Sequence, residues 1–306
     1  MTSHLTILGW HNVESTWCFP VSGSGVAGLE GQLRRLRRVA TVVPLERALD
    51  ALRAGEPLPP RAVALCWDDG YRDNLELAVP VLERLELPAT FFLVPGLLSG
   101  TERAWWEVAG WAFARSGRDA VEWRGERYPT RGAAGRTAYG RASDRLRVMT
   151  AAGRAVALEE LVDALAPEGT PGDGRLFLDW DGARELVRRG FSVGSHTMRH
   201  VTLAQETPED QVEDLRRSRE LLQRELDVPI RTVAYPFGQA DAVSRETEHA
   251  AEQAGYAHGL TTEFGWNGPA TPAAHGRRIM LDPDRGFVAT GLSRVTGRLR
   301  RLRGAG

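Results

Sequence analysis

The chain has 306 residues, an apolar fraction of 42% and a formal net charge of −1. This composition suits a globular protein with a sizeable core and gives no global attraction to nucleic acid or to an anionic membrane surface. The sequence shows neither an apolar stretch long enough to span a membrane nor the pattern of a signal peptide, and two cysteines make no disulfide framework. We therefore expect a cytoplasmic protein with no integral membrane segment and no nucleic-acid partner.

Predicted strands and helices alternate along the first part of the chain. Helical spacing of apolar residues and a Pro/Gly pair at the ends of the second segment support the predicted helices. Pro80 lies inside the third predicted helix and is expected to kink it. The predicted strands are 5–10, 61–67 and 89–94, and the predicted helices are 28–39, 44–55 and 74–87.

The segment of about 98–178 interrupts this alternation and is expected to be a helical insertion. It contains Trp105, Trp106 and Trp111 on a predicted helix, a polar loop at 116–140 and a helical stretch at 141–166. We expect the tryptophans to anchor the core of the insertion; a stacking surface for a sugar ring is the alternative.

The alternation then resumes and predicts an α/β fold with a parallel sheet in one domain spanning 1–306. An Arg-rich helix is expected at about 286–303, with a solvated face or a contact to an anionic partner as its two interpretations. The remaining predicted elements are helices 179–190, 207–226 and 244–255 and strands 191–195, 230–235, 256–262 and 276–281.

Two adjacent carboxylates, Asp68 and Asp69, follow the strand predicted at 61–67. Working groups of such folds sit at the C-terminal ends of the strands. A helix cap with a turn at Gly70 is the structural alternative. Because side chains of successive strand residues diverge, one carboxylate can bind a cation while the other addresses a water or substrate.

Two histidines, His196 and His200, follow the strand predicted at 191–195. If residues 196–200 form a helical turn, both imidazoles lie on one face. A pair of surface histidines is the alternative. Two imidazoles with one carboxylate would make a three-ligand site with open positions, typical of zinc-like metals.

A third strand end carries the sequence Tyr-Pro-Phe-Gly at 235–238, whose tight turn could present backbone N–H groups to an oxyanion. Together, the three strand ends resemble the motifs of the polysaccharide deacetylases, the family 4 carbohydrate esterases. Residues 66–70 resemble the first motif, residues 196–200 the second and residues 234–238 part of the third. The N-terminal ILGWHNV resembles a strand found in one subgroup. The resemblance covers roughly 5–95 and 175–282.

This resemblance implies a distorted (β/α)7 barrel that removes an N-acetyl group, typically from N-acetylglucosamine. It also implies a divalent metal, most often Zn2+, although Co2+, Ni2+ or Mn2+ would suit the same ligands. By position, Asp69, His196 and His200 would be the metal ligands and Asp68 the general base. The backbone N–H of Tyr235 is expected to stabilise the oxyanion.

The chain also departs from the family pattern. The Arg of the third motif is missing, and Arg277 or Arg278 on the last strand could replace it. The late Leu-x-x-His motif, which supplies the general acid, is not evident. The subgroup with a His on its first strand makes His11 the candidate acid, with His275 as the second choice.

Three functions stay open on this basis. The first is a metal-dependent deacetylase of an N-acetylated amino sugar in an oligosaccharide, polysaccharide or glycoside. The second is an amidohydrolase of a small biosynthetic intermediate, because a cytoplasmic chain does not easily meet a cell-wall polymer. The third is an inactive carbohydrate-binding relic, which metal content would help to distinguish from an enzyme.

Overall fold

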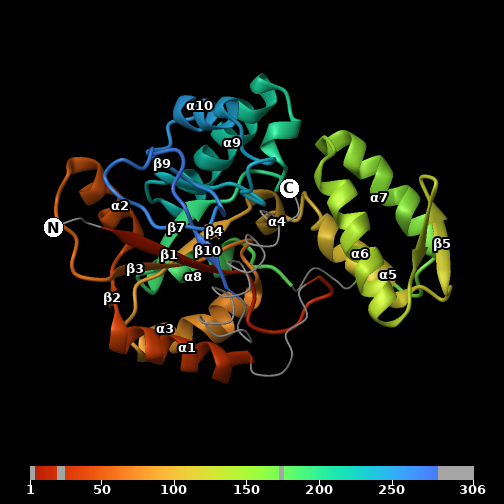
Figure 1. Cartoon of the computed structure of the whole chain (residues 1–306), viewed down its shortest axis with the longest axis horizontal. Coiled ribbons are helices and arrows are strands. Elements are labelled where there is room, and N and C mark those ends of the chain that lie inside the picture. The colour runs from red at the N-terminus through yellow and green to blue at the C-terminus, as the bar shows by residue number, and fades with distance from the viewer. Residues whose placement is uncertain (1–3, 19–24, 172–175, 282–306) are drawn as a thin grey trace, which may run out of the picture.

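The computed structural model describes residues 4–18, 25–171 and 176–281. Its centre is a curled parallel sheet in the order β10-β1-β3-β4-β7-β8-β9, with β2 paired to β3 (Figure 1). The predicted distorted (β/α)7 barrel fold is confirmed by this half-barrel of parallel strands and crossover helices. Its strands are β1 (Leu5–Trp10), β2 (Thr41–Val42), β3 (Ala62–Trp67), β4 (Thr90–Leu93), β7 (Ser192–Ser195), β8 (Thr232–Ala234), β9 (His258–Leu260) and β10 (Ile279–Met280).

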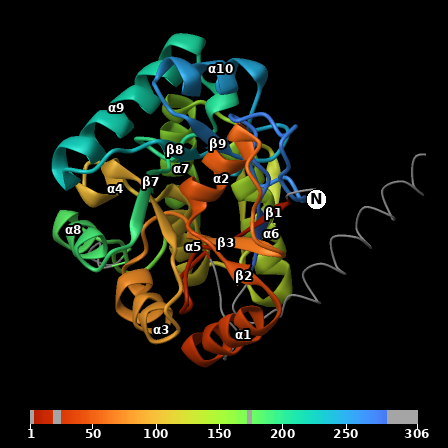
Figure 2. The same ribbon diagram turned by 90° about the vertical axis from the view of Figure 1, so that its left-hand side faces the viewer.

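Helices cover the outer face of this sheet (Figure 2). Apart from the helix at Leu45–Ala54, the apolar faces of these helices and the outward-facing strand residues form one buried cluster, as expected where a parallel sheet is covered by crossover helices. The barrel helices are α1 (Gly25–Val39), α2 (Leu45–Ala54), α3 (Val79–Arg84), α4 (Pro95–Leu98), α8 (Trp180–Arg188), α9 (Pro208–Leu226) and α10 (Arg245–Gln253), with a short 3-10 turn η2 at Leu203–Gln205.

Alternate residues of the strands point to opposite faces of the sheet. On β3, Val63, Leu65 and Trp67 join the cluster under the outer helices, whereas Ala64 and Cys66 join a second cluster with α2. This period of two predicts that the next residue, Asp68, continues on the side of Ala64 and Cys66.

The helix predicted at 74–87 begins differently. Residues Asn74–Ala78 form a π-helical turn, η1, and α3 follows with Pro80 near its start. Proline has no N–H to donate, so the regular i to i−4 ladder cannot run through it. At the position where a kink was predicted, the structure therefore changes from a π-helical turn to an α-helix.

The segment between α4 and α8 projects from the barrel as a separate lobe (Figure 1). It has its own buried core, to which the indoles of Trp105, Trp106 and Trp111 belong. The lobe consists of α5 (Trp105–Arg115), the antiparallel hairpin β5 (Ala120–Trp123) and β6 (Glu126–Pro129), α6 (Gly132–Arg147) and α7 (Ala151–Leu165).

The prediction of a loop over 116–140 was wrong. Val121, Trp123 and Tyr128 are buried in the hairpin, so alternation specifies two short strands. Arg124 and Gly125 have φ values of 49° and 79°, the conformation of a tight two-residue hairpin turn. The helix predicted over 141–166 is divided into α6 and α7, and Thr150 caps α7 by accepting from the Gly153 N–H.

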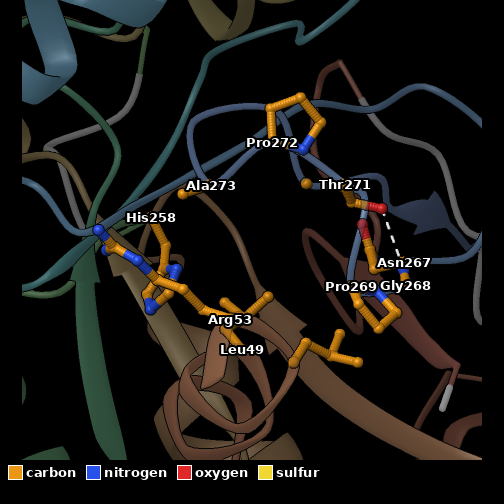
Figure 3. Close-up of a pocket in the computed structure, with 11 residues that line it drawn as sticks. Leu49, Arg53, His258, Asn267, Gly268, Pro269, Thr271, Pro272 and Ala273 are labelled. Atoms are coloured by element: carbon orange, nitrogen blue, oxygen red, sulfur yellow. Dashed lines mark hydrogen bonds between the residues drawn. The ribbon is translucent and has the colours of Figure 1, made fainter. Parts of the chain in front are cut away.

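A small pocket of about 100 Å3 lies at the N-terminal ends of the strands, between α2 and the 267–276 loop (Figure 3). His258, which begins β9, is buried there and its Nε2 lies 2.8 Å from Asp50 Oδ1. The pocket contains none of the residues predicted to act in catalysis. The Arg-rich helix predicted at 286–303 lies outside the described residues. Within those residues, no helix has the length and apolar character needed to cross a membrane.

Candidate metal centre

Strand register brings the candidate residues to one edge of the sheet. Trp10 on β1 pairs with Trp67 on β3, so the residues that follow them, His11 and Asp68, leave neighbouring strands together. Likewise, Leu93 on β4 pairs with Ser195 on β7, the residue before His196. The C-terminal strand edge therefore carries both the Asp pair and the first His of the predicted site.

Asp69, His196 and His200 form a buried three-residue cluster suited to a metal ion. Asp69 Oδ1 lies 3.3 Å from His196 Nε2 and 3.2 Å from His200 Nε2. Metal–ligand bonds of about 2.0–2.2 Å at near-tetrahedral to octahedral angles place ligand atoms roughly 2.8–3.6 Å apart. The observed separations fall in that range.

The hydrogen bonding of His196 favours a cation in this cluster. His196 Nδ1 lies 2.7 Å from the Ala234 carbonyl oxygen, an acceptor, so Nδ1 carries the proton. In the neutral imidazole, Nε2 then presents a lone pair toward Asp69. Asp69 Oδ1 is buried and makes no hydrogen bond of good geometry within the described structure. Two lone-pair donors this close are stable only with a positive charge between them.

The electrostatics of the cluster agree with this interpretation. Burial would raise the pKa of the Asp69 carboxyl, but the imidazoles of His196 and His200 bring it well below its usual value. Burial lowers the pKa of His200 to about 4, so this imidazole is neutral and able to ligate at physiological pH. Burial would lower the pKa of His196, but the carboxylates of Asp68 and Asp69 raise it above its usual value, so a cation would bind here by displacing a proton from His196. The donor set of one carboxylate and two imidazoles then fits a divalent ion with open coordination positions.

The two imidazoles converge by a route that the sequence did not predict. Residues 196–200 form an irregular loop rather than a helical turn. Thr197 and His200 have φ values of 65° and 51°, in the left-handed region that non-glycine residues rarely occupy. Such a conformation persists only where surrounding contacts impose it.

Asp214 on α9 supplies those contacts. Its buried carboxylate accepts the Met198 N–H at 2.7 Å and the Arg199 Nε–H at 2.9 Å. Met198 and Arg199 lie between the two histidine ligands, so Asp214 fixes the loop that orients them.

We expect Asp214→Ala to lower metal affinity by about 10- to 100-fold, as changes in groups that orient ligands do. Chelator-competition titration would measure it, with Glu213→Ala on the exposed face of the same helix as control. Asp214→Asn should restore part of the loss because its amide oxygen can still accept the Met198 N–H. Unchanged affinity in Asp214→Ala would show that the loop holds its shape without this carboxylate.

Asp68 forms a buried ion pair with Arg278. Arg278 Nη1 donates to Asp68 Oδ1 at 2.7 Å, and its Nε donates to the Thr261 carbonyl at 3.1 Å. Burial would raise the pKa of Asp68, but the Arg278 guanidinium, together with His196 and His11, holds it below its usual value. Of the two arginines that the sequence offers as replacements for the third-motif Arg, Arg278 is therefore the one in contact with Asp68. The side chain of its neighbour Arg277 packs against Gly265 instead.

His11 lines the same cleft as Asp68 and Asp69. Asn74 donates to the His11 carbonyl at 2.8 Å, and Asp73 accepts the N–H groups of Val13 and Glu14 at 2.7 and 2.8 Å. The segment that follows the Asp pair therefore holds the loop that begins at His11.

The second candidate acid, His275, does not lie in this cleft. Its two ring nitrogens face carboxylates instead, with Nδ1 at 2.6 Å from Glu248 and Nε2 at 3.3 Å from Glu263. Both sides of the His275 imidazole face carboxylates, and of the two candidates only His11 lines the cleft.

Tyr235 does not fit the role predicted for it. Its N–H donates to the Leu260 carbonyl at 2.9 Å as part of the β8–β9 pairing, and its hydroxyl donates to the Ala274 carbonyl at 3.1 Å. Phe237, two residues later, lines the cleft and has a φ of 63°. Its N–H donates no hydrogen bond within the described part of the chain. The turn shape was predicted, but not the position at which an N–H becomes free.

The cleft above these residues has a volume of about 340 Å3, at the lower end of the range for small-molecule sites. The insertion builds one wall of it. Trp106 lies over His200, with 4.1 Å between ring centroids, and donates from Nε1 to the Tyr71 hydroxyl at 2.9 Å. Trp105 packs near Phe237. Both indoles are 5% exposed, so they anchor the core of the insertion and also line the cleft.

Comparison with known proteins identifies the class to which this fold and site belong. Residues 55–259, more than half of the chain, match the family model for polysaccharide deacetylases. The chain therefore belongs to the polysaccharide deacetylase family. It is also 34% identical over 82 residues to YxkH of Bacillus subtilis (strain 168), a protein named as a polysaccharide deacetylase. That match covers 27% of this chain and 28% of the relative, so it spans only part of that protein.

Solved structures share the fold over almost the whole chain. The deacetylase PplD of Streptococcus pyogenes, solved with acetate, superposes with a TM-score of 0.62 at 18% identity, covering 94% of this chain and 96% of that one. IcaB of Ammonifex degensii gives a TM-score of 0.58 at 21% identity, covering 92% and 93%. At these identities the likeness supports the fold alone.

Proposed function

We propose that the protein is a metal-dependent hydrolase that removes the N-acetyl group from an N-acetylated amino sugar. The observation that carries this proposal is the pairing of two sites in one cleft. Asp69, His196 and His200 form a cluster suited to a cation, and beside it Asp68 is held ionised by Arg278. Membership of the deacetylase family supports the reaction type.

The residues of the chain divide the chemistry among them. Asp69, His196 and His200 would hold a divalent ion, most simply Zn2+, which would act as a Lewis acid in the hydrolysis of the amide. Asp68 is the base that accepts the proton of the attacking water, because its lowered pKa keeps it ionised. Its distance of 4.0 Å from His196 Nε2 places it next to the ligand cluster without joining it.

The oxyanion needs a hydrogen-bond donor in addition to the ion. Phe237 supplies one in our proposal, since its backbone N–H donates to no group among the described residues and the residue lines the cleft beside His200. The positive φ of Phe237 is consistent with a turn shaped for a function rather than for stability.

His11 is the general acid in this proposal and protonates the leaving amine. His11→Ala should lower kcat by about 100- to 10,000-fold, the range for losing a general acid or base, and leave metal content unchanged. His249→Ala, which changes an exposed histidine on α10, is the control. An unchanged kcat in His11→Ala would assign protonation of the amine to another group.

Acetate release tests the proposed function directly. Purified protein is stripped with a chelator and then assayed with and without added Zn2+ on N-acetylglucosamine, its simple glycosides and chitooligosaccharides. Zinc-dependent acetate is expected. Acetate released only from small non-carbohydrate amides would favour a biosynthetic amidohydrolase, and sugar binding without release would favour a relic.

A further inference from the structure

Residues 11–18, which we call the His11 strap, connect the end of β1 to the insertion. The strap leaves the C-terminal edge of the sheet at His11 and runs toward α5 (Figure 1). His11 and Cys18, its two ends, both line the cleft that contains the metal ligands. The strap therefore borders this cleft and carries the proposed general acid.

The barrel holds the half of the strap that is nearer to His11. Asp73 and Asn74 bind the backbone of residues 11, 13 and 14. A segment that is held at one end alone keeps conformational freedom, which costs free energy to remove. A defined position for His11 therefore also depends on what holds residues 16–18.

Glu107 on α5 of the insertion holds that second half. Its Oε2 accepts the Trp17 N–H at 3.0 Å and the Cys18 N–H at 3.2 Å, and its Oε1 accepts the Tyr71 hydroxyl at 2.7 Å. Burial raises the pKa of Glu107, and hydrogen bonds from Thr16, Tyr71 and the two backbone N–H groups oppose this rise. Releasing the strap would leave buried polar groups unpaired, so these contacts hold it firmly.

Gly110, almost one turn further along α5, lets the strap lie directly on the helix. A Cβ atom at this position would lie 2.8 Å from the backbone C and O atoms of Trp17. Atoms of a folded chain do not approach so closely, so a larger residue would displace the strap. Tyr139 on α6 adds a further contact by donating from its hydroxyl to Cys18 Sγ at 2.8 Å.

The hydrogen bonds of Glu107 also extend to the metal site. The Tyr71 hydroxyl that Glu107 binds accepts the Trp106 Nε1–H at 2.9 Å, and Trp106 lies over His200. One buried carboxylate of the insertion therefore connects the strap that carries His11 with the indole that covers a metal ligand.

We propose that Glu107 is a positioning residue, which holds the His11 strap so that the His11 imidazole stays within reach of the leaving amine. This inference rests on the proposed function and deepens it, because it gives the insertion a task in the proton transfer. A general acid acts only within hydrogen-bond reach of the atom that it protonates. A displacement of about 1 Å is enough to cost on the order of 100-fold in rate.

The test compares a substrate that needs an acid with one that does not. Zn2+-loaded protein is assayed for acetate release from tri-N-acetylchitotriose and for hydrolysis of 4-nitrophenyl acetate. The amine of the saccharide must gain a proton as it leaves, whereas 4-nitrophenolate leaves without one. Glu107→Ala should lower kcat on the saccharide by about 100-fold, with little change in KM, in metal content or in the rate on the ester.

Two matched variants accompany Glu107→Ala. Glu107→Gln should recover much of the loss, because its amide oxygen can still accept the Trp17 and Cys18 N–H groups. Glu159→Ala, which changes an exposed glutamate of α7, should behave like wild type.

Gly110→Ala displaces the strap while Glu107 stays in place. Alanine favours a helix more than glycine does, so α5 itself should not be weakened. The new Cβ should nevertheless push Trp17 away and cause the same selective loss on the saccharide.

The double variant His11→Ala/Glu107→Ala shows whether the carboxylate acts through the histidine. It should be no slower on the saccharide than His11→Ala, because a missing acid and a misplaced acid fail at the same step. Losses that multiply in the double variant would overturn the inference. An equal loss on saccharide and ester in Glu107→Ala would also overturn it and would assign Glu107 to the metal centre or to the fold.

The outcomes also separate this inference from the proposed function. Either of those results leaves the deacetylase function standing as long as wild type releases acetate. An unchanged kcat in His11→Ala would reject the acid on which the inference depends. Absence of acetate with wild-type protein from N-acetylglucosamine, its glycosides and chitooligosaccharides would reject the proposed function, and the inference with it.

Discussion

Replacing Asp69 by Asn should abolish metal binding and acetate release together. Asp69 is the anionic member of the ligand cluster, and its Oδ1 faces both imidazoles at 3.2–3.3 Å. The amide of Asn carries no charge to balance a divalent ion, and its oxygen is a weaker metal ligand than a carboxylate oxygen. Changes in groups that only orient ligands already cost about 10- to 100-fold in affinity, so loss of a ligand should cost more. His196→Ala and His200→Ala should behave alike.

Metal content after dialysis and thermal unfolding provide readouts that do not depend on activity. An ion that binds only the folded state raises the melting temperature, so Zn2+ should stabilise wild type and not Asp69→Asn. His249→Ala, in which an exposed histidine outside the cleft is removed, should respond to Zn2+ like wild type. A ligand variant that keeps full metal occupancy would exclude that residue from the centre.

The parts of the site that could be predicted are those whose position depends only on neighbouring residues in the sequence. Asp68 and Asp69 directly follow an apolar strand, and His196 follows another, so their place at the sheet edge needs only strand ends and parallel topology. The convergence of His200 is different. It depends on positive φ values at Thr197 and His200 and on Asp214, a residue of another helix. The spacing of four residues between the histidines predicts a helical turn. The contacts that impose the loop instead come from a distant helix, so this spacing cannot predict them.

The sequence also could not show which of two nearby residues faces the site. Arg277 and Arg278 are identical residues just before β10, but their side chains point to different sides of the chain, and only Arg278 contacts Asp68. Similarly, Tyr235 and Phe237 share one turn. Pairing between β8 and β9 uses the Tyr235 N–H, and the strand ends before Phe237. Register set by distant partners decided both cases.

Asp68→Asn should retain metal and lose about 100- to 10,000-fold in kcat, because an amide cannot accept the proton of water.

The Arg278→Gln variant tests what keeps Asp68 ionised. Without the guanidinium, burial dominates and the pKa of Asp68 rises. The acidic limb of the kcat/KM profile should then move to higher pH, and activity at neutral pH should fall. An acidic limb that stays in place would show that another group sets it.

Stability should follow the same linkage with a defined sign. In wild type the pKa of Asp68 is lower in the folded state than in the unfolded state. This difference stabilises the folded protein at pH values above the unfolded-state pKa, and the stabilisation is lost as pH falls through the folded-state pKa. In Arg278→Gln the raised pKa reverses this: the folded state is favoured at low pH and loses stability as pH rises through that pKa. Breaking a buried pair costs about 3–5 kcal/mol, so the loss of stability in Arg278→Gln should be largest near neutral pH.

The double variant Asp68→Asn/Arg278→Gln, with no buried charge left at the pair, should recover much of that stability without recovering activity. Denaturant unfolding of the metal-free proteins at several pH values would measure both effects. A double variant no more stable than Arg278→Gln would mean that the loss comes from packing around Arg278 rather than from an unpaired carboxylate.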